Sequence, residues 1–438
     1  MGHLHEIKRV YRDLRKRIDT TPSGLPEGPA VYDILKILFS EEEAALAARL
    51  PIVPTSIDIL AARFKENKET LKAKLDRMAD KGLVLDAVHP RSGKAFYLLA
   101  PPVVGFFEFS LMRVRTDINQ KELARHYHRY MEEDHAFAKM FFGGDTVHGR
   151  TLVNENAVNE GDVSYILDYE RATALIEQSK GGSVTLCYCR HKAGHLGTAC
   201  DKPVETCISL FNAAEHLIRH DLARRASKEE LLDLLARSRA MGLVQICDNV
   251  KQKPSFICNC CGCCCNMLQG INLHGIPHAV KTSNFIAHVD AASCVGCGRC
   301  ARACPIGAVS LLPVPFAKRK KYPLSARVDE SLCLGCGVCA AACNQRAMGM
   351  DPRPERVLTP ETTVERVVNM ALERGKLQHI LFSDPESLTH TVLNRFLGVF
   401  LNLPPVKKTL LSKQVKSRFV QSMVAAALGK SRKWVKKV

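Results

Sequence analysis

The sequence contains one cysteine spacing twice, and this repetition constrains the fold more than any other feature. Both runs follow the pattern C-x2-C-x2-C-x3-C, with thiols at Cys294, Cys297, Cys300 and Cys304 and then at Cys333, Cys336, Cys339 and Cys343. Cysteines two residues apart wrap a tight turn, and the glycines between them permit backbone angles and close approaches that a side chain would block. Each run is therefore expected to bend around a centre that several sulfur atoms hold.

Residues 285–350 resemble a bacterial-type two-cluster ferredoxin domain, in which two such runs hold two [4Fe-4S] clusters. The resemblance implies short strands, such as residues 286–289 and 309–312, beside each cysteine turn. In that family the last cysteine of each run ligates the other cluster. The resemblance thus implies two ligand sets: Cys294, Cys297, Cys300 and Cys343, and then Cys333, Cys336, Cys339 and Cys304.

One position departs from the family pattern. Asn344 stands where the first run has Pro305. Proline there directs the chain but donates no bond to iron, so ligation by four thiolates should survive, whereas local rigidity and the potential of one cluster are in doubt. Zinc is the alternative metal, but zinc sites use two separate C-x2-C pairs rather than four consecutive ligands and a proline.

Eleven further cysteines lie outside the two runs. Ten of them form a second candidate metal set, which is more thiol than one cubane requires: Cys187, Cys189, Cys200, Cys207, Cys258, Cys260, Cys261, Cys263, Cys264 and Cys265. We expect one or two further iron-sulfur clusters here; zinc and packing or redox thiols are the alternatives. The first four could form one set or share a site with the 258–265 run, and His191 and His195 could ligate or lie in an exposed turn.

Composition places the chain in a reducing compartment. Nineteen cysteines without an export signal indicate metal ligands rather than disulfides, and no segment has the apolar length of a membrane span. The expected location is the cytoplasm, and oxidation-prone clusters favour an oxygen-poor, anaerobic cell. Neither a P-loop nor a G-x-G-x-x-G fingerprint is present, so nucleotide or flavin chemistry would belong to a partner.

The N-terminal third carries a different pattern. It predicts a helix over residues 55–64, a second over 67–78 that ends at Gly82, and a hairpin of residues 83–88 and 95–99. This order resembles a winged-helix domain, with residues 31–50 as its leading helices. DNA is a possible partner, but the candidate reading helix mixes Lys68 and Lys72 with Glu69 and Asp76 and lacks a clear basic face.

The predicted fold class is α+β and multidomain. The expected domains are a winged-helix-like domain with an N-terminal helix (1–110), a helical connector (111–180), a cysteine-rich domain (181–270), a ferredoxin-like βαβ cluster domain (285–352) and a helical basic region (353–438). In the central domain we expect a strand over 183–186 and a helix that Ser227 and Glu230 cap and that ends near Gly242.

The net charge of +17 is concentrated in places. Ten Lys and Arg residues follow Leu403, where no acidic residue occurs, and Lys318-Arg-Lys-Lys321 lies between the two runs. Phe419, Met423 and Leu428 would give the tail an apolar helical face. Such a tail could bind an acidic protein or an anionic membrane surface, or it could be a solvated terminal helix or arm.

Three functions fit these features. The first is an electron-transfer protein or reductase subunit, an oxidoreductase component in which the two [4Fe-4S] clusters relay electrons between a redox partner protein and the central domain. The second is a reductase whose central cluster is incompletely ligated and binds substrate. The third is a redox-sensing regulator that couples cluster state to the winged helix.

Overall fold

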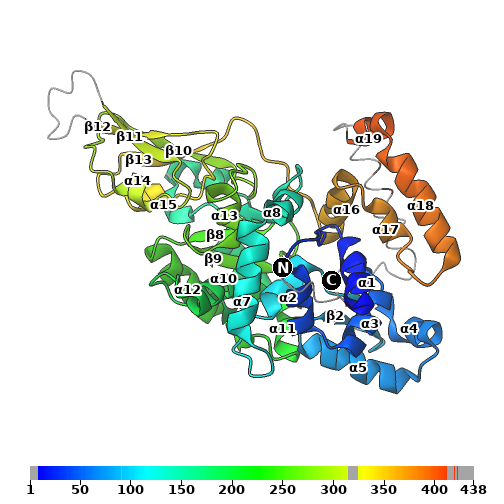
Figure 1. The fold of residues 1–438 in the computed structure, drawn as a ribbon. Coiled ribbons are helices and arrows are strands. Elements are labelled where there is room, and N and C mark those ends of the chain that lie inside the picture. The colour runs from blue at the N-terminus through cyan, green and yellow to red at the C-terminus, as the bar shows by residue number, and fades with distance from the viewer. Residues whose placement is uncertain are drawn as a thin grey trace, which may run out of the picture. The chain divides into compact units, whose positions relative to one another are not determined.

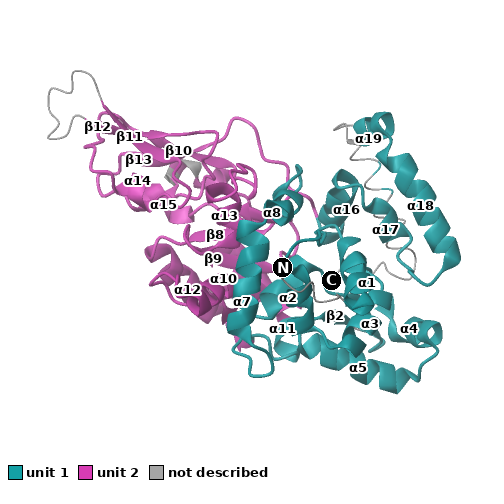
Figure 2. Cartoon of the chain, viewed as in Figure 1, with its two compact units in different colours: residues 1–146, 216–223, 362–438 teal, residues 147–215, 224–361 magenta. Residues whose placement is uncertain are grey.

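The computed structural model describes residues 8–411 except 90, 159 and 314–323, together with Phe419 and Ser422. The chain forms two compact units, each assembled from separate stretches (Figure 2). Unit 1 comprises residues 1–146, 216–223 and 362–438, and unit 2 comprises residues 147–215 and 224–361. The predicted boundaries treat the domains as consecutive, whereas the contacts interleave them.

The first part of unit 1 contains the helices and hairpin that the sequence predicts. Three helices come first: α1 (Arg9–Asp19), α2 (Val31–Leu38) and α3 (Glu41–Arg49). There follow β1 (Thr55–Ser56), α4 (Ile57–Phe64), α5 (Lys68–Asp80), β2 (Val84–Val88) and β3 (Ala95–Leu99); Figure 1 labels the two helices and β2. The strands pair in the order β1-β3-β2. Asn67 caps α5 by accepting a hydrogen bond from the Thr70 N–H, and Leu71, Leu75 and Met78 form its buried face.

The remainder of unit 1 is helical. Its elements are α6 (Phe107–Phe109), α7 (Gln120–His128), α8 (His135–Phe142), α16 (Thr363–Glu373), α17 (Leu377–Leu381), α18 (Leu388–Asn402) and α19 (Pro404–Leu411). Phe107 is fully buried and packs against Tyr127, Tyr130 and Phe137. Apart from Phe419, the predicted apolar face of the basic tail lies outside the described residues, as does Lys318-Arg-Lys-Lys321.

Unit 2 is built on a six-stranded antiparallel sheet with the order β4-β8-β9-β6-β5-β7. Its strands and helices are β4 (Gly149–Thr151), α9 (Ala172–Ser179), β5 (Gly182–Leu186), α10 (Tyr188–Leu196), β6 (Glu205–Leu210), α11 (Phe211–Arg219, whose last residues count with unit 1), β7 (Arg224–Ala226), α12 (Lys228–Ala240), β8 (Val244–Asp248), β9 (Phe256–Cys260) and α13 (Asn266–Asn272). Ser227 caps α12 as predicted, and its Leu231 and Leu235 join the core formed with α9 and the sheet.

The two cysteine runs lie between strands that pair across the repeats. The elements are β10 (Phe285–Val289), α14 (Arg299–Ala303), β11 (Val309–Pro313), β12 (Leu324–Val328), α15 (Val338–Ala341) and β13 (Met348–Pro352). The predicted strands at 286–289 and 309–312 are present, and each repeat reads strand, helix, strand. Pairing, however, joins β10 to β13 and β11 to β12, both antiparallel, so the repeats exchange strands.

The structure is thus mixed helix and strand, as the predicted α+β class requires. Among the described residues, no helix is both long and apolar enough to cross a bilayer.

Candidate metal centres

Each cysteine run lines its own cavity and borrows one thiol from the other run. One cavity, of about 340 Å³, is lined by Cys294, Cys297, Cys300 and Cys343. The other, of about 330 Å³, is lined by Cys304, Cys333, Cys336 and Cys339. These are the two sets that the resemblance to two-cluster ferredoxins implies, and iron binding by their thiolates stays a prediction.

The glycines of the runs are held against neighbouring backbone. Gly335 has φ of +70°, and a Cβ there would lie 2.0 Å from the Phe285 carbonyl oxygen. At the equivalent Gly296, also at φ of +70°, a Cβ would lie 2.4 Å from the Leu324 carbonyl oxygen. Only glycine fits these two turns, because the left-handed backbone and the close strand both exclude a side chain.

The second cavity is lined by its four cysteines and by apolar side chains that include Ala287, Ile306 and Met350. Burial, aided by the nearby sulfurs of Cys304 and Cys333, raises the pKa of Cys336 to about 12. The Ala308 N–H donates a hydrogen bond of 3.2 Å to Cys304 Sγ. A cavity of this size, lined by thiols and apolar side chains and offered backbone N–H groups, suits an anionic cluster held by four thiolates.

Six of the central cysteines form a ring of neighbouring sulfur atoms in unit 2. Each has its side chain within hydrogen-bonding reach of the next, in the order Cys187, Cys207, Cys258, Cys260, Cys265, Cys189 and back to Cys187. Within this group Cys265 Sγ lies 3.2 Å from Cys260 Sγ. We call this group the six-cysteine ring.

The other four predicted central cysteines gather separately. The sulfur atoms of Cys200, Cys261, Cys263 and Cys264 all lie within 4.8 Å of one another. Cys187, Cys189 and Cys207 therefore join the 258–265 run and not Cys200, so a set made of the first four central cysteines is wrong. Cys247, outside the predicted set, belongs to neither group, because it is fully buried in the sheet core.

Arg190 is the functional residue that the sequence reasoning missed. Its side chain is 1% exposed, and its guanidinium donates to the Asn259 carbonyl at 3.2 Å and to Cys261 Sγ at 3.7 Å. Burial acts to lower the pKa of Arg190, but the neighbouring sulfurs of Cys187, Cys261 and Cys207 outweigh it and raise the pKa. The signal that the sequence offered is the position of Arg190 directly after Cys189, because a cation beside metal-binding thiols can pair with their negative charge.

Within unit 2 the loop that carries the central cysteines contacts the second cysteine cavity. A Cβ on Gly262 would lie 2.3 Å from the Pro305 carbonyl oxygen. The Asn272 side-chain amide donates to that carbonyl at 2.9 Å and to the Gly262 carbonyl at 3.0 Å. Because Pro305 directly follows Cys304, the two cysteine systems are separated by very little backbone.

Comparison with known families identifies the cysteine runs. Residues 293–347 match the 4Fe-4S dicluster domain. This part of the chain is a ferredoxin-type iron-sulfur domain, and it supports an iron-sulfur electron-transfer role. No match to the chain is found among curated proteins or among solved structures. The dicluster domain accounts for the two cavities, whereas the central cysteines lie outside the matched residues.

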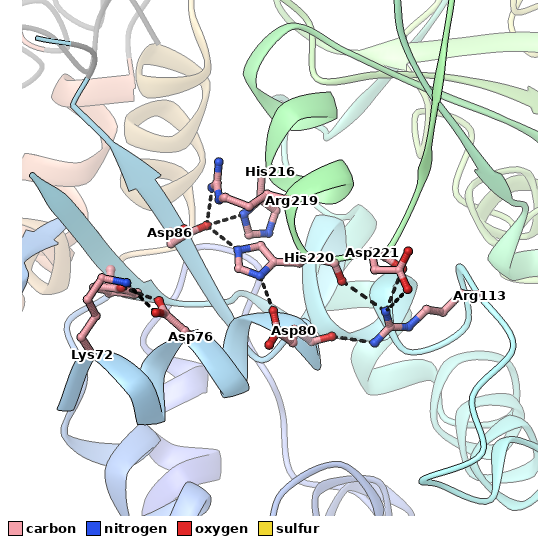
Figure 3. Close-up of polar contacts among 10 residues, drawn as sticks. Lys72, Asp76, Asp80, Asp86, Arg113, His216, Arg219, His220 and Asp221 are labelled. Atoms are coloured by element: carbon pink, nitrogen blue, oxygen red, sulfur yellow. Dashed lines mark hydrogen bonds and ion pairs between the residues drawn. The ribbon is translucent and has the colours of Figure 1, made fainter. Parts of the chain in front are cut away.

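A third polar cluster, in unit 1, has ligand-like geometry but the charge pattern of an ion-pair network (Figure 3). Asp86 Oδ1 lies 2.7 Å from His216 Nδ1, 2.9 Å from His220 Nε2 and 2.6 Å from Arg219 Nη2. The Arg219 guanidinium already supplies positive charge to the oxygen that a metal ion would need. This cluster therefore fastens β2 to the end of α11 and the turn that follows it.

The titration of this cluster follows from its burial. Burial acts to raise the pKa of Asp86, but hydrogen bonds from His216, His220 and Arg219 outweigh it and hold the pKa well below its ordinary value. Burial likewise acts to lower the pKa of His220, yet its bonds to Asp86 and Asp80 raise it. For His216, burial prevails and the pKa is lowered, so this ring stays neutral.

Replacing Asp86 by Asn should therefore destabilise unit 1 by about 3 kcal/mol, the cost of leaving a buried charged partner unpaired. The stability advantage of the wild type should fall below about pH 4, where Asp86 binds a proton in the unfolded chain before it does so in the folded one. It should fall again above about pH 6.5, as the pH rises toward the raised His220 pKa. Chemical denaturation across this pH range measures it. The exposed Asp221, paired with Arg113 at 3.6 Å, gives the control Asp221→Asn, which should unfold like the wild type.

Gly335→Ala should prevent assembly of the cluster held by Cys304, Cys333, Cys336 and Cys339, because its Cβ collides with Phe285 backbone. The loss should be about four irons per chain in anaerobically purified protein. Gly307→Ala is the matched control: Gly307 has φ of +66° but nothing within 4 Å of an added Cβ. Equal iron loss in both variants would attribute the effect to backbone strain rather than to the close strand.

Proposed function

We propose that the protein is an iron-sulfur electron-transfer component of an oxidoreductase, in which the dicluster domain exchanges electrons with a further iron-sulfur cluster in the six-cysteine ring. The dicluster domain then carries two [4Fe-4S] clusters, ligated by the crossed sets, and the ring carries the additional one. A redox partner protein supplies or accepts the electrons at the other end.

The observation that carries this proposal is the contact between Gly262 and Pro305. Pro305 follows Cys304, a thiol of one cavity, and Gly262 lies two residues after Cys260, a member of the ring. Electron transfer slows steeply as the separation between centres grows. A backbone contact reinforced by both Asn272 hydrogen bonds therefore supplies a short and rigid route between the two systems.

The ring supports a cluster because six thiols from separate strands, a helix and a loop meet there, each beside the next. Cys187, Cys189, Cys260 and Cys265 are buried, and Arg190 supplies one positive charge to the group. Thiolates bind metal, and an iron-sulfur core supplies further positive charge that offsets part of their negative charge. Six thiolates also outnumber the four terminal positions of a cubane, so two of them bridge irons or stand aside.

Burial favours electron relay over direct reaction with substrate. Four ring members are buried and the other two, Cys207 and Cys258, are half-buried, so an iron held there has limited access to a substrate. A substrate-binding central cluster is the alternative, and a change in the cluster's EPR spectrum on adding a substrate would favour it.

Unit 1 fits a winged-helix-like docking domain better than a DNA reader. The helix, helix and hairpin order with the strand order β1-β3-β2 supports the winged-helix reading. On α5, however, Lys68 pairs with Asp58, Lys72 with Asp76 and Lys74 with Glu66. Since these ammonium groups are already neutralised, a phosphate backbone gains little from them, which weighs against the redox-sensing regulator.

The C-terminal region adds a second surface for a partner. Along α18 the exposed side chains of Leu388, Val392, Phe396 and Val399 recur at helical spacing, and each is at least 65% exposed. Exposed apolar rows of this kind mark interaction sites. Together with the basic tail they suit an acidic redox partner or an anionic membrane surface, in a cytoplasm poor in oxygen.

Iron and sulfide content test the further cluster. Protein purified without oxygen should contain clearly more sulfide than the roughly eight per chain that two cubanes need. Cys207→Ala, which breaks the ring, should return sulfide to about eight and leave the EPR signals of the dicluster domain unchanged. A wild type with only about eight sulfides contradicts a third cluster.

Gly262→Ala tests the route itself, because the added Cβ must push Pro305 away from the central loop. Transfer from the dicluster clusters to the central cluster should slow several-fold when followed by freeze-quench EPR after rapid reduction, while iron content stays constant. Gly194→Ala is the control, since nothing lies within 4 Å of a Cβ at that position. Unchanged transfer in Gly262→Ala would show that electrons take another path.

A further inference from the structure

The four-cysteine group differs from the dicluster cavities in the spacing of its sulfur atoms. Cys200 Sγ lies 3.7 Å from Cys261 Sγ, and Cys263 Sγ lies 3.7 Å from Cys264 Sγ. All four sulfurs lie within 4.8 Å of one another. The dicluster sets instead line cavities of about 330 and 340 Å³.

This spacing has a direct geometrical reading. A tetrahedral metal ion with metal–sulfur bonds of about 2.3 Å places its ligand sulfurs about 3.8 Å apart. A cubane cannot be held at that spacing, because each thiolate binds a different iron at a different corner and the four must stand around the whole cluster. The observed separations match one ion and leave no room for four irons and their sulfides.

The local fold also prepares these sulfur atoms for a metal. The Lys202 N–H donates to Cys200 Sγ, the Cys264 N–H to Cys261 Sγ and the Cys200 N–H to Cys264 Sγ. The Arg190 guanidinium adds a donor 3.7 Å from Cys261 Sγ. Burial raises the pKa of Cys261 and Cys264, so it is a bound metal ion that would hold these sulfurs as thiolates, and the N–H groups are the donors that such thiolates accept most strongly.

We propose that Cys200, Cys261, Cys263 and Cys264 hold a single tetrahedral metal ion, zinc or iron, with no inorganic sulfide. This site is separate from the cluster proposed for the six-cysteine ring and does not depend on it. The ion ties the loop after α10 to the loop between β9 and α13, and so fixes Gly262 where it meets Pro305.

The full-length protein, purified without oxygen, provides a test that needs no variant. A four-thiolate ion adds a metal but no sulfide, whereas a cubane has equal iron and sulfide. We expect either one zinc per chain, with an X-ray absorption spectrum showing about four sulfur neighbours at about 2.3 Å and no nearby metal, or about one iron more than sulfide. A protein that contains no zinc and no more iron than sulfide would overturn the proposal.

The double variant Cys200→Ala/Cys263→Ala identifies the site. It should lose one metal ion per chain and keep its sulfide, and loss of zinc or of iron tells the two ions apart. Cys247→Ala is the matched control, because that buried cysteine belongs to neither group. Loss of about four irons with their sulfide would make the group a cluster site and overturn the proposal. The ring's cluster is assessed separately, by the sulfide that Cys207→Ala removes.

Discussion

The spread of each set of thiols governs which metal centre it could hold in unit 2. Four sulfur atoms that all lie within 4.8 Å of one another fit a single ion, whereas sulfur atoms arranged around a cavity or a wider ring leave space for a cluster. The dicluster domain keeps its thiols apart by exchanging strands: β10 pairs with β13 and β11 with β12, which brings the last cysteine of each run to the other run's cavity. The central loop does the opposite. Between Cys260 and Cys265 it packs five cysteines into six residues, so its sulfurs must crowd.

The cysteines of the central loop divide between the six-cysteine ring and the four-cysteine group according to their position in the loop. Cys260 and Cys265, at the two ends of the loop, join Cys187, Cys189 and Cys207 from the neighbouring strands and helix. The residues between them turn to Cys200 instead. The ends of the loop therefore contribute to the six-cysteine ring and its middle contributes to the four-cysteine group. Gly262, in the middle, has no side chain and so lies against Pro305.

The sequence was sufficient wherever a local rule decides the structure. The helix starts at Asn67 and Ser227 and the hairpin follow from spacing and turn chemistry, and the resemblance to two-cluster ferredoxins implies the crossed ligand sets of the dicluster domain. The sequence could not predict which side chains lie together where segments far apart in the chain meet. Nothing in the spacing of Cys200 separates it from Cys207, because the sheet, in which β6 pairs with β9, decides which thiol faces which. The network of Asp86 with His216 joins residues 130 positions apart, which no local pattern reveals.

Arg190 links the two central sites through one charge. Its guanidinium interacts with Cys187 and Cys207 of the ring and with Cys261 of the four-cysteine group. Burial removes the water that would otherwise screen these interactions, so each group experiences the charge of the other through the shared cation. In the proposed arrangement, an electron added to the ring's cluster would draw on the same positive charge that faces Cys261 at the proposed metal ion. Arg190 would then let the redox state of one site bear on the other.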